Sequence, residues 1–509
     1  MALVKPWSLH RLASAAPGGR LLAAPRNQRC MRACASVVRH SHGDADAPTP
    51  ECDHGDSSFA ARFNASYGAV VGALVGDAAG APAEFPVVGT LVSSLRHVMY
   101  APLRVLGMQR GRALPSPRVL FSMPGHGARS QRQPTLGDVW AAVRAHRRGE
   151  FLPPSTACVE LAMSMGGGGK LGVAPGQVTD DGELTMTLLG ALASDACITG
   201  DVDLSAIAVG YQAWLLDKPF DMGLTTYTAL QESLNVQSAR LAAGASQVDA
   251  AYAMHSVAQR NNAGSKANGS VMRASPIAVW GHRLPLQAVG RLAAVDSALT
   301  HPNPTVCVAN GAYCIAIAHL IQSAAEDSAG SDEARRHAAY QAALAWAEQH
   351  DSVAGAEVAL WLKQAAALSH AEIGYWPSIG FVRLGFTHAF RHLMCGTPFE
   401  AAIEETITGG GDTDTNAAIV GGLLGAVVGY EGLPQRLVKP VLECDTRLGA
   451  QRRKLQYHPS QAKALVERLC SHGPSDETSF HLRRRKHLPV GERAPLAELN
   501  LIAQQGLRD

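Results

Sequence analysis

The chain has 509 residues, of which 47% are hydrophobic, 17% are charged and 50 are glycine. A chain of this length and composition can bury a sizeable core without disulfides, which excludes disordered, collagen-like and disulfide-scaffold proteins. The 45 Lys and Arg residues nearly balance the 43 Asp and Glu residues, and the formal net charge is +2. Taken alone, this balance suggests a mildly basic protein.

The positive charge is concentrated at the N-terminus. Residues 1–43 contain seven Lys and Arg residues and no acidic residue. Segments that are rich in Arg and poor in acids are typical of organellar transit peptides. We therefore expect a presequence at 1–43 and a mitochondrial location, with a plastid location or, without cleavage, a cytoplasmic one as alternatives. Cleavage would leave 38 basic against 43 acidic residues, a net charge of about −5.

A helical domain is predicted to follow. Residues 44–57 are polar and acidic and indicate a linker, and the domain is expected at 58–470. Within it, Gly68, Gly72 and Gly76 fall every four positions, which lets the first helix approach another closely. Strand-like alternation is scarce, so we predict an all-α fold. Apolar residues at helical spacing predict helices at 60–79, 184–196, 284–299, 306–321, 335–368, 381–394 and 415–429.

Two segments lack this pattern. Residues 91–175 carry several Pro, Gly and Arg residues, and we interpret them as a partly ordered insertion with a short helix at 136–147. The extension 471–509 contains a basic run at 483–486 and a possible helix at 496–507. A short basic run is more often a solvated tail than a nucleic-acid patch, so nucleic acid is not an expected partner.

Neither the apolar runs nor the cysteines change this picture. The longest apolar run, 417–430, is too short to span a bilayer, and no membrane segment is predicted. The ten cysteines include no CxxC pair, which argues against a zinc ribbon or a thioredoxin-type site.

Carboxylates are crowded where two of the predicted helices begin. One Asp or Thr there is an ordinary N-cap, but each of these starts carries two Asp and at least one Thr. Carboxylates packed so closely repel one another unless a cation neutralises them, and hard oxygen ligands suit Mg²⁺ or Mn²⁺ better than zinc. A metal site is therefore favoured over double capping. The residues are Thr179, Asp180 and Asp181 before the one helix, and Asp412, Asp414 and Thr415 before the other.

Two further segments offer polar groups. Residues 266–276 read as a loop that enters a helix, and its Gly, Ser and Asn residues can offer N–H groups and hydroxyls to phosphate oxygens. His301 follows the helix predicted at 284–299, where a lone His is usually a partner of the helix dipole. By itself His301 has no assigned role.

In chain order, GALVGDAAGAPAEF, VTDDGELTMTLL, KANGSVMRASP, LTHPNP and TPFEAAIEETITGGGDTDTNAAIVGGLLGAVVGY resemble the motifs of the ADP-ribosylglycohydrolase family. This family includes the glycohydrolase that reactivates dinitrogenase reductase. The resemblance runs from about residue 65 to about residue 435. TDDGEL departs from the TDDT of many members, although Thr179, Asp180 and Asp181 are intact. The resemblance implies an orthogonal helical bundle with two Mg²⁺ or Mn²⁺ ions.

The resemblance also implies a role for each matching residue. The metal ligands would be the six residues at the two crowded helix starts, and Glu84 and Asp412 would be the catalytic carboxylates, either of which could be the general base. The substrate pocket would be formed by Asp77, Asn268, Gly269, Ser270, Met272, Arg273, His301, Gly410 and Gly411.

The expected activity is metal-dependent hydrolysis of the C1″ glycosidic bond of an ADP-ribosylated protein or a small ADP-ribose conjugate, by a monomer. Nucleic acid is expected as a partner only where it is itself an ADP-ribosylated substrate. One alternative is a catalytically idle family member that only binds ADP-ribose or serves as a structural protein. The other is a metal-dependent phosphohydrolase acting on nucleotide diphosphates, which would release phosphate or AMP instead of intact ADP-ribose.

Overall fold

The computed structural model describes residues 57–84, 153–198, 201–245, 248–326, 330–375, 378–474 and 481–482. The expected presequence, the linker up to residue 56, the helices at 136–147 and 496–507 and the basic run at 483–486 lie outside these residues. The described part of the insertion, 153–175, contains a helix, α5 (Thr156–Met163), that packs against the main helical body.

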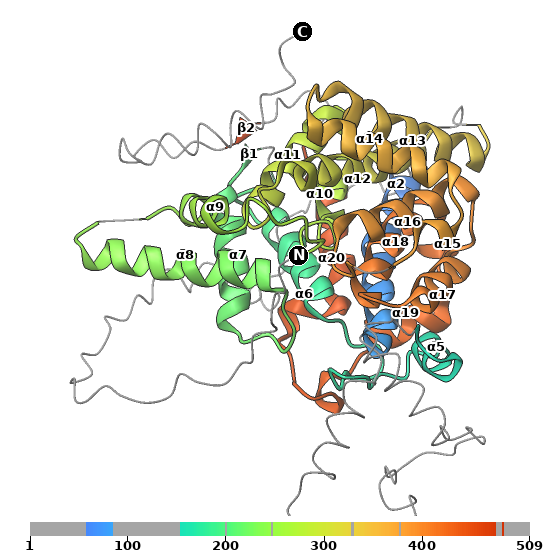
Figure 1. Cartoon of the computed structure of the whole chain (residues 1–509), viewed down its shortest axis with the longest axis horizontal. Helices are drawn as coiled ribbons and strands as arrows, with labels where there is room; N and C mark the ends of the chain where they lie inside the picture. Colours follow the sequence, from blue (N-terminus) through green and yellow to red (C-terminus); the bar gives the residue numbers. More distant parts are fainter. Residues whose placement is uncertain are drawn as a thin grey trace, which may run out of the picture. The chain divides into compact units, whose positions relative to one another are not determined.

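The described residues form an all-α fold, as predicted (Figure 1). Two-residue strands β1 (Asp201–Val202) and β2 (His481–Leu482) form a short parallel pair. The remaining helices are α2 (Ser57–Gly80), η2 (Ala81–Ala83), α6 (Asp180–Leu192), α7 (Leu204–Leu216), α8 (Leu224–Ala242), α9 (Ala250–Asn261), α10 (Ser275–Trp280), α11 (Leu286–Ala298), α12 (Pro304–Ser323), α13 (Asp332–Gln349), α14 (Val353–Ala367), α15 (His370–Ile373), α16 (Val382–Cys395), α17 (Phe399–Gly409), α18 (Thr413–Val428), η4 (Tyr430–Gly432), α19 (Gln435–Leu442), η5 (Thr446–Leu448), η6 (Leu455–Tyr457), η7 (Pro459–Gln461) and α20 (Ala462–His472).

One predicted helix was wrong. The pattern at 335–368 belongs to two helices, α13 and α14, that pack against each other. The chain breaks because Ser352 starts a new helix: its hydroxyl accepts a hydrogen bond from the Gly355 N–H at 3.1 Å. The other six predicted helices are present with shifted ends, and α6 begins four residues earlier than expected, at Asp180.

The glycine stripe of α2 packs against α18, as the spacing suggested for a close helix partner. A Cβ atom added at Gly76 would lie 2.0 Å from Ala417 O, and one at Gly68 would lie 2.3 Å from Gly425 O. Because positions early in α2 face positions late in α18, the two helices are antiparallel. This contact brings the C-terminal end of α2 to the N-terminal end of α18, where the Thr413 hydroxyl donates to Gly80 O at 2.8 Å.

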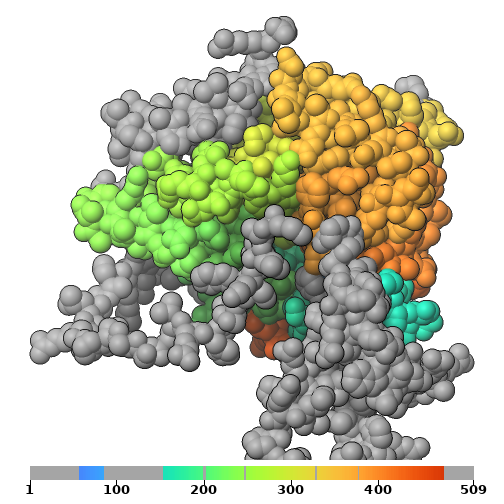
Figure 2. All heavy atoms as spheres, viewed as in Figure 1, coloured from blue at the N-terminus to red at the C-terminus, as the bar shows by residue number. Residues whose placement is uncertain are grey.

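Helix α12 lies in the core, where α10, α11, α13 and α14 pack around it. By length and composition, α12 is the one helix among the described residues that could cross a membrane. However, 89% of its most apolar 18-residue stretch is buried inside the molecule. The space-filling view shows α8 and α9 in green beside the yellow and orange surface of the later helices (Figure 2).

Candidate functional site

The ends of α2, α6 and α18 meet at one place, and Asp77 joins two of them. Asp77 is fully buried in the last turn of α2. Its carboxylate accepts hydrogen bonds from the Thr179 N–H at 2.9 Å, the Thr179 hydroxyl at 2.8 Å and the Gly182 N–H at 2.8 Å. Asp77 thus caps the N-terminus of α6 from another helix. Expected to bind substrate, it lies instead among the predicted metal ligands.

Carboxylate oxygens converge here in two overlapping groups. One oxygen each of Asp77, Asp181 and Asp414 lie within 4.8 Å of one another, and the same holds for Glu84, Asp412 and Asp414. Asp414 belongs to both groups, and the Thr415 hydroxyl donates to Asp181 Oδ2 at 3.3 Å. Predicted ligands that are more than 200 positions apart in the chain are therefore side by side. We call the following set the acidic centre: Asp77, Glu84, Thr179, Asp180, Asp181, Asp412, Asp414 and Thr415.

The acidic centre is chemically suited to divalent cations. Asp181 Oδ1 and Glu84 Oε2 are buried and have no hydrogen-bond partner among the described residues. Burial and then the neighbouring carboxylates raise the pKa of Asp181 and Asp414 well above the ordinary value. Unpartnered carboxylate oxygens that repel one another are stabilised by a cation, and an all-oxygen set fits Mg²⁺ or Mn²⁺.

The two predicted catalytic carboxylates differ in exposure. Glu84 follows η2 and is only 7% exposed, and burial, then Asp221 and Asp412, raise its pKa to about 9. Asp412 is partly exposed at the N-cap position of α18. It accepts a hydrogen bond from the Asn268 side-chain amide at 2.6 Å. Asp412 is therefore the carboxylate of this pair that solvent and substrate can reach more easily.

Asp221, between α7 and α8, is a member of this region that the sequence did not reveal. Its charge, after burial itself, raises the pKa of both Glu84 and Asp180, which places it against the acidic centre. The Gly223 N–H, two residues later, donates to Asp180 Oδ2 at 3.3 Å. Asp221 lies in a segment with neither helical periodicity nor a repeated acidic motif, so nothing in the chain pattern identified it.

Lys170 is a second missed residue, and it lies in the segment interpreted as an insertion. Its positive charge lowers the pKa of Glu84 and of Asp221, against the larger effect of burial. The glycine run before it packs on η2: a Cβ atom at Gly169 would lie 2.7 Å from the Cα atom of Pro82. The close packing of these glycines on η2 therefore places the exposed Lys170 at the edge of the acidic centre.

Glu183, the third acid at the start of α6, does not join the acidic centre. The Arg453 guanidinium pairs with both of its oxygens, at 2.6 and 2.8 Å, and the Trp214 indole N–H donates to Oε2 at 2.7 Å. All three side chains are buried or nearly so. Glu183 is neutralised by protein groups, whereas Asp180 and Asp181 are not.

The predicted substrate residues divide into two kinds. Ser270, Arg273 and His301 are at most 1% exposed. Arg273 donates to the Thr300 hydroxyl at 2.9 Å and lies over the Tyr211 ring, 4.3 Å from its centroid. These three side chains hold the loop in place. Burial, and then Arg273, lower the pKa of His301 to about 3, so its ring is neutral.

Among the other predicted substrate residues, Met272 and the glycines before Asp412 border the acidic centre, whereas Gly269 lies against His301. Met272 Sδ lies 3.9 Å from the Thr415 hydroxyl oxygen. Gly269 packs on His301, and a Cβ atom there would lie 3.1 Å from the imidazole ring. Gly410 and Gly411 have φ angles of 75° and 81°, a backbone conformation that favours glycine, and they lead directly into Asp412.

Comparisons with known proteins identify the family and several similar proteins. The model of the ADP-ribosylglycohydrolase family matches residues 59–472. A protein of Acanthamoeba polyphaga mimivirus named as an ADP-ribosyl glycohydrolase is 26% identical over 290 residues, 55% of this chain and 78% of that protein. The ADP-ribosyl-[dinitrogen reductase] glycohydrolase of Rhodospirillum rubrum is 22% identical over 278 residues, 53% of this chain and 75% of that protein. A solved ADP-ribosylglycohydrolase-related protein complex has a TM-score of 0.46 at 18% identity, covering 81% of this chain and 99% of the other.

Proposed function

The chain belongs to the ADP-ribosylglycohydrolase family, and from this premise we propose that it hydrolyses the C1″ glycosidic bond of an ADP-ribosylated protein or a small ADP-ribose conjugate. We propose further that the reaction depends on two Mg²⁺ or Mn²⁺ ions. The observation that carries both proposals is the pair of overlapping carboxylate groups that share Asp414. Two ligand groups with one shared member are the arrangement expected of a binuclear centre.

The chemistry requires negative potential at the ribose. When the glycosidic bond breaks, positive charge develops at C1″, and carboxylates held nearby stabilise it. Asp412, Glu84 and Asp221 supply that potential from three separate segments. Divalent cations, when bound, would grip ribose hydroxyls and lower the pKa of a bound water.

A carboxylate must also accept the proton of the attacking water. Asp412 is the more exposed of the two candidates, and Asn268 fixes one of its oxygens at 2.6 Å. Glu84 has a buried oxygen without a partner. Either can act as the base, and comparing Glu84→Gln with Asp412→Asn in single turnover separates the two roles.

Two substitutions test the proposal. Asp412→Ala and Asp180→Ala are expected to abolish metal-dependent release of ADP-ribose while the helical circular dichroism spectrum is unchanged. Asp332→Ala is a matched control, because that side chain is 79% exposed on α13. The assay uses ADP-ribosyl-arginine, ADP-ribosyl-serine and O-acetyl-ADP-ribose, each with Mg²⁺ and with Mn²⁺.

The products separate the proposal from its alternatives. Intact ADP-ribose supports glycosidic cleavage, whereas AMP or phosphate would identify a phosphohydrolase. Binding of ADP-ribose in calorimetry without turnover of any conjugate would identify an idle binding protein. Full activity after chelation would overturn the two-metal scheme.

A further inference from the structure

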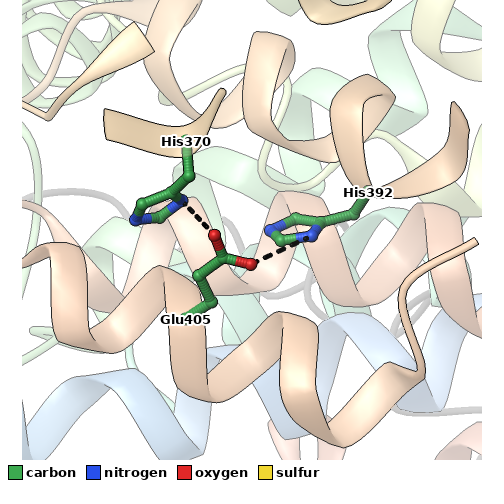
Figure 3. Close-up of side chains that lie close together, drawn as sticks. All are labelled: His370, His392 and Glu405. Atoms are coloured by element: carbon green, nitrogen blue, oxygen red, sulfur yellow. Dashed lines mark ion pairs between the residues drawn. The ribbon is translucent and has the colours of Figure 1, made fainter. Parts of the chain in front are cut away.

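A second group of possible metal ligands lies outside the acidic centre, on three helices. His370 comes from α15, His392 from α16 and Glu405 from α17, and one ligand atom of each lies within 4.8 Å of the others. The Glu405 carboxylate reaches up from α17 between the two imidazole rings (Figure 3). His370 Nδ1 is 3.1 Å from Glu405 Oε1, and His392 Nδ1 is 3.8 Å from Oε2. We call these three residues the histidine cluster.

The imidazole nitrogens of the histidine cluster are not satisfied by the protein. His392 is fully buried, and neither of its ring nitrogens has a hydrogen-bond partner among the described residues. His370 Nδ1 is close to Glu405 but is not aligned for a hydrogen bond. A buried polar atom left in this state destabilises the folded protein. One ligand atom of each of the three side chains lies within 4.8 Å of the others, so the three atoms surround a common point.

The distances suit such a common point. Two ligands of a tetrahedral zinc ion lie ~3.3 Å apart when each is ~2.0–2.1 Å from the metal. The two measured separations, 3.1 and 3.8 Å, fall on either side of this value.

The charges around the histidine cluster also permit a cation. Burial lowers the pKa of His392 to about 3 and lowers that of His370, so both rings are neutral at pH 7, the form that binds metal. Arg391 faces the same carboxylate, with Nη1 3.6 Å from Oε1. His370 Nδ1 faces this same oxygen, whereas His392 Nδ1 faces Oε2. His388 is occupied elsewhere, because its Nε2 bonds Gly374 O at 3.0 Å.

We propose that His370, His392 and Glu405 bind one Zn²⁺ ion in a site separate from the acidic centre. Two imidazole nitrogens and one carboxylate are a ligand set of zinc sites that leave a fourth position for water. The side chains of His370 and Glu405 are 21% and 34% exposed, which gives the ion a path from solvent. This site is independent of the proposed function, since it shares no ligand with the acidic centre.

The zinc ion would hold in place the segment after α15, which contacts the loop that precedes Asp412. Tyr375 follows His370 closely in the chain, and its ring packs against the glycines that precede Asp412: a Cβ atom at Gly409 would lie 2.0 Å from the ring. Gly409 ends α17, and the run continues into Asp412. Holding α15 to α16 and α17 would therefore keep Tyr375 against the loop that precedes Asp412. The zinc ion would therefore have a structural role, and the residues of the histidine cluster are positioning residues.

The test measures binding of Zn²⁺ alone to the full-length protein in excess Mg²⁺, which keeps the acidic centre filled. Equilibrium dialysis with metal analysis is expected to give one Zn²⁺ per chain. His370→Ala and Glu405→Gln are expected to weaken binding at least about 100-fold, since even loss of an outer-shell partner of a metal ligand costs 10- to 100-fold. His337→Ala is the control, because this His is exposed on α13, and it should bind as the wild type does.

Two further measurements test which residues bind the ion and whether the site is separate from the acidic centre. Co²⁺ in place of Zn²⁺ should give the strong visible absorption of a four-coordinate site with nitrogen ligands, lost in His370→Ala. Asp181→Asn should retain Zn²⁺, which separates this site from the proposed function. The proposal is overturned if the wild type takes up no Zn²⁺, if His370→Ala binds it as tightly as the wild type, or if Asp181→Asn alone abolishes binding.

Discussion

A short stretch of chain links Glu405 of the histidine cluster, within α17, to Asp412 of the acidic centre, yet the two groups arrange buried polar side chains in opposite ways. The acidic centre gathers like charges, and burial and repulsion raise the pKa of its carboxylates. The histidine cluster places neutral rings around one carboxylate that Arg391 already faces. The first group needs a cation to be stable, whereas the second can accept one without needing it.

The largest expected effect tests this contrast at the acidic centre. Asp181→Asn removes one charge from the acidic centre, and ADP-ribose release should fall about 10³-fold because a metal ligand is lost. The same change should stabilise the metal-free protein, since it relieves repulsion among buried carboxylates. Steady-state kinetics and thermal unfolding in chelator measure the two effects.

Glu405→Gln is the matched change in the histidine cluster. Activity should fall by no more than a few-fold, because the change removes no group of the acidic centre and acts on Asp412 only through Tyr375 and the loop before Asp412. The comparison fails if Asp181→Asn destabilises the chelated protein, or if Glu405→Gln is as inactive as Asp181→Asn.

The second effect concerns the glycine stripe that carries Asp77 to α18. Gly76→Ala would place a methyl group 2.0 Å from Ala417 O, a backbone atom that cannot move aside alone. Overpacking of this kind should lower the free energy of unfolding by about 2–3 kcal/mol. Activity should fall with it, because Asp77 and Asp414 are separated, while Zn²⁺ binding at the histidine cluster should persist.

Gly190→Ala is its control. Gly190 also lies within a helix, and nothing is within 4 Å of a Cβ atom there. This variant should gain about 0.5–1 kcal/mol from helix propensity. Chemical denaturation of both variants checks the pair, and equal effects would show that the close contact between α2 and α18 does not matter.

The third effect is the pH dependence of stability. In chelator, Asp77 has a pKa of about 7 and Glu84 of about 9, both raised above the unfolded values near ~4. Raised carboxylate pKa values give stability that is complete below the unfolded pKa and is lost as pH rises through the folded pKa. Asp77 loses its contribution by about pH 7, so the Tm of the chelated protein should fall by several degrees between pH 7 and pH 9 through Glu84 alone.

The histidine cluster should not contribute to that slope. Its lowered pKa values confine its titration to below about pH 6.5, where stability is lost as pH falls. Scanning calorimetry with chelator and with excess Mg²⁺ separates the two groups, and Glu84→Gln should flatten the slope in chelator. A slope that is the same with and without Mg²⁺ would contradict the assignment.

Much of the acidic centre could be predicted from the sequence because its ligands sit at helix starts. The pairs around Asp180 and Asp412 exceed what capping requires, and the glycine spacing of α2 indicates a close helix partner. The identity of that partner, α18, could not be predicted, since a stripe of small residues fits any helix with a matching stripe.

The residues that were missed share a physical reason. Asp221 and Lys170 lie in segments without helical period, and only the packing of η2 and the loops brings them to Glu84. His370, His392 and Glu405 come from three helices, two of which the pattern did not predict. The burial of Arg273, which was predicted to line the substrate pocket, depends on Asp296 and Tyr211, which no motif includes.

The smallest expected effect concerns Lys170, the exposed cation beside the acidic centre. Its charge lowers the pKa of Glu84 and Asp221, so it lies close enough to attract a diphosphate toward a site that is otherwise negative. Lys170→Ala should raise KM by less than about tenfold and leave kcat nearly unchanged, since an exposed charge acts mainly on encounter and is screened by salt. The increase should shrink at high ionic strength and disappear in Lys170→Arg. Lys363→Ala, an exposed lysine paired with Glu348, should change neither constant. If Lys170→Ala instead lowers kcat at every ionic strength, the lysine acts on the carboxylates themselves, and the acidic centre relies on a protein cation, as the histidine cluster does with Arg391.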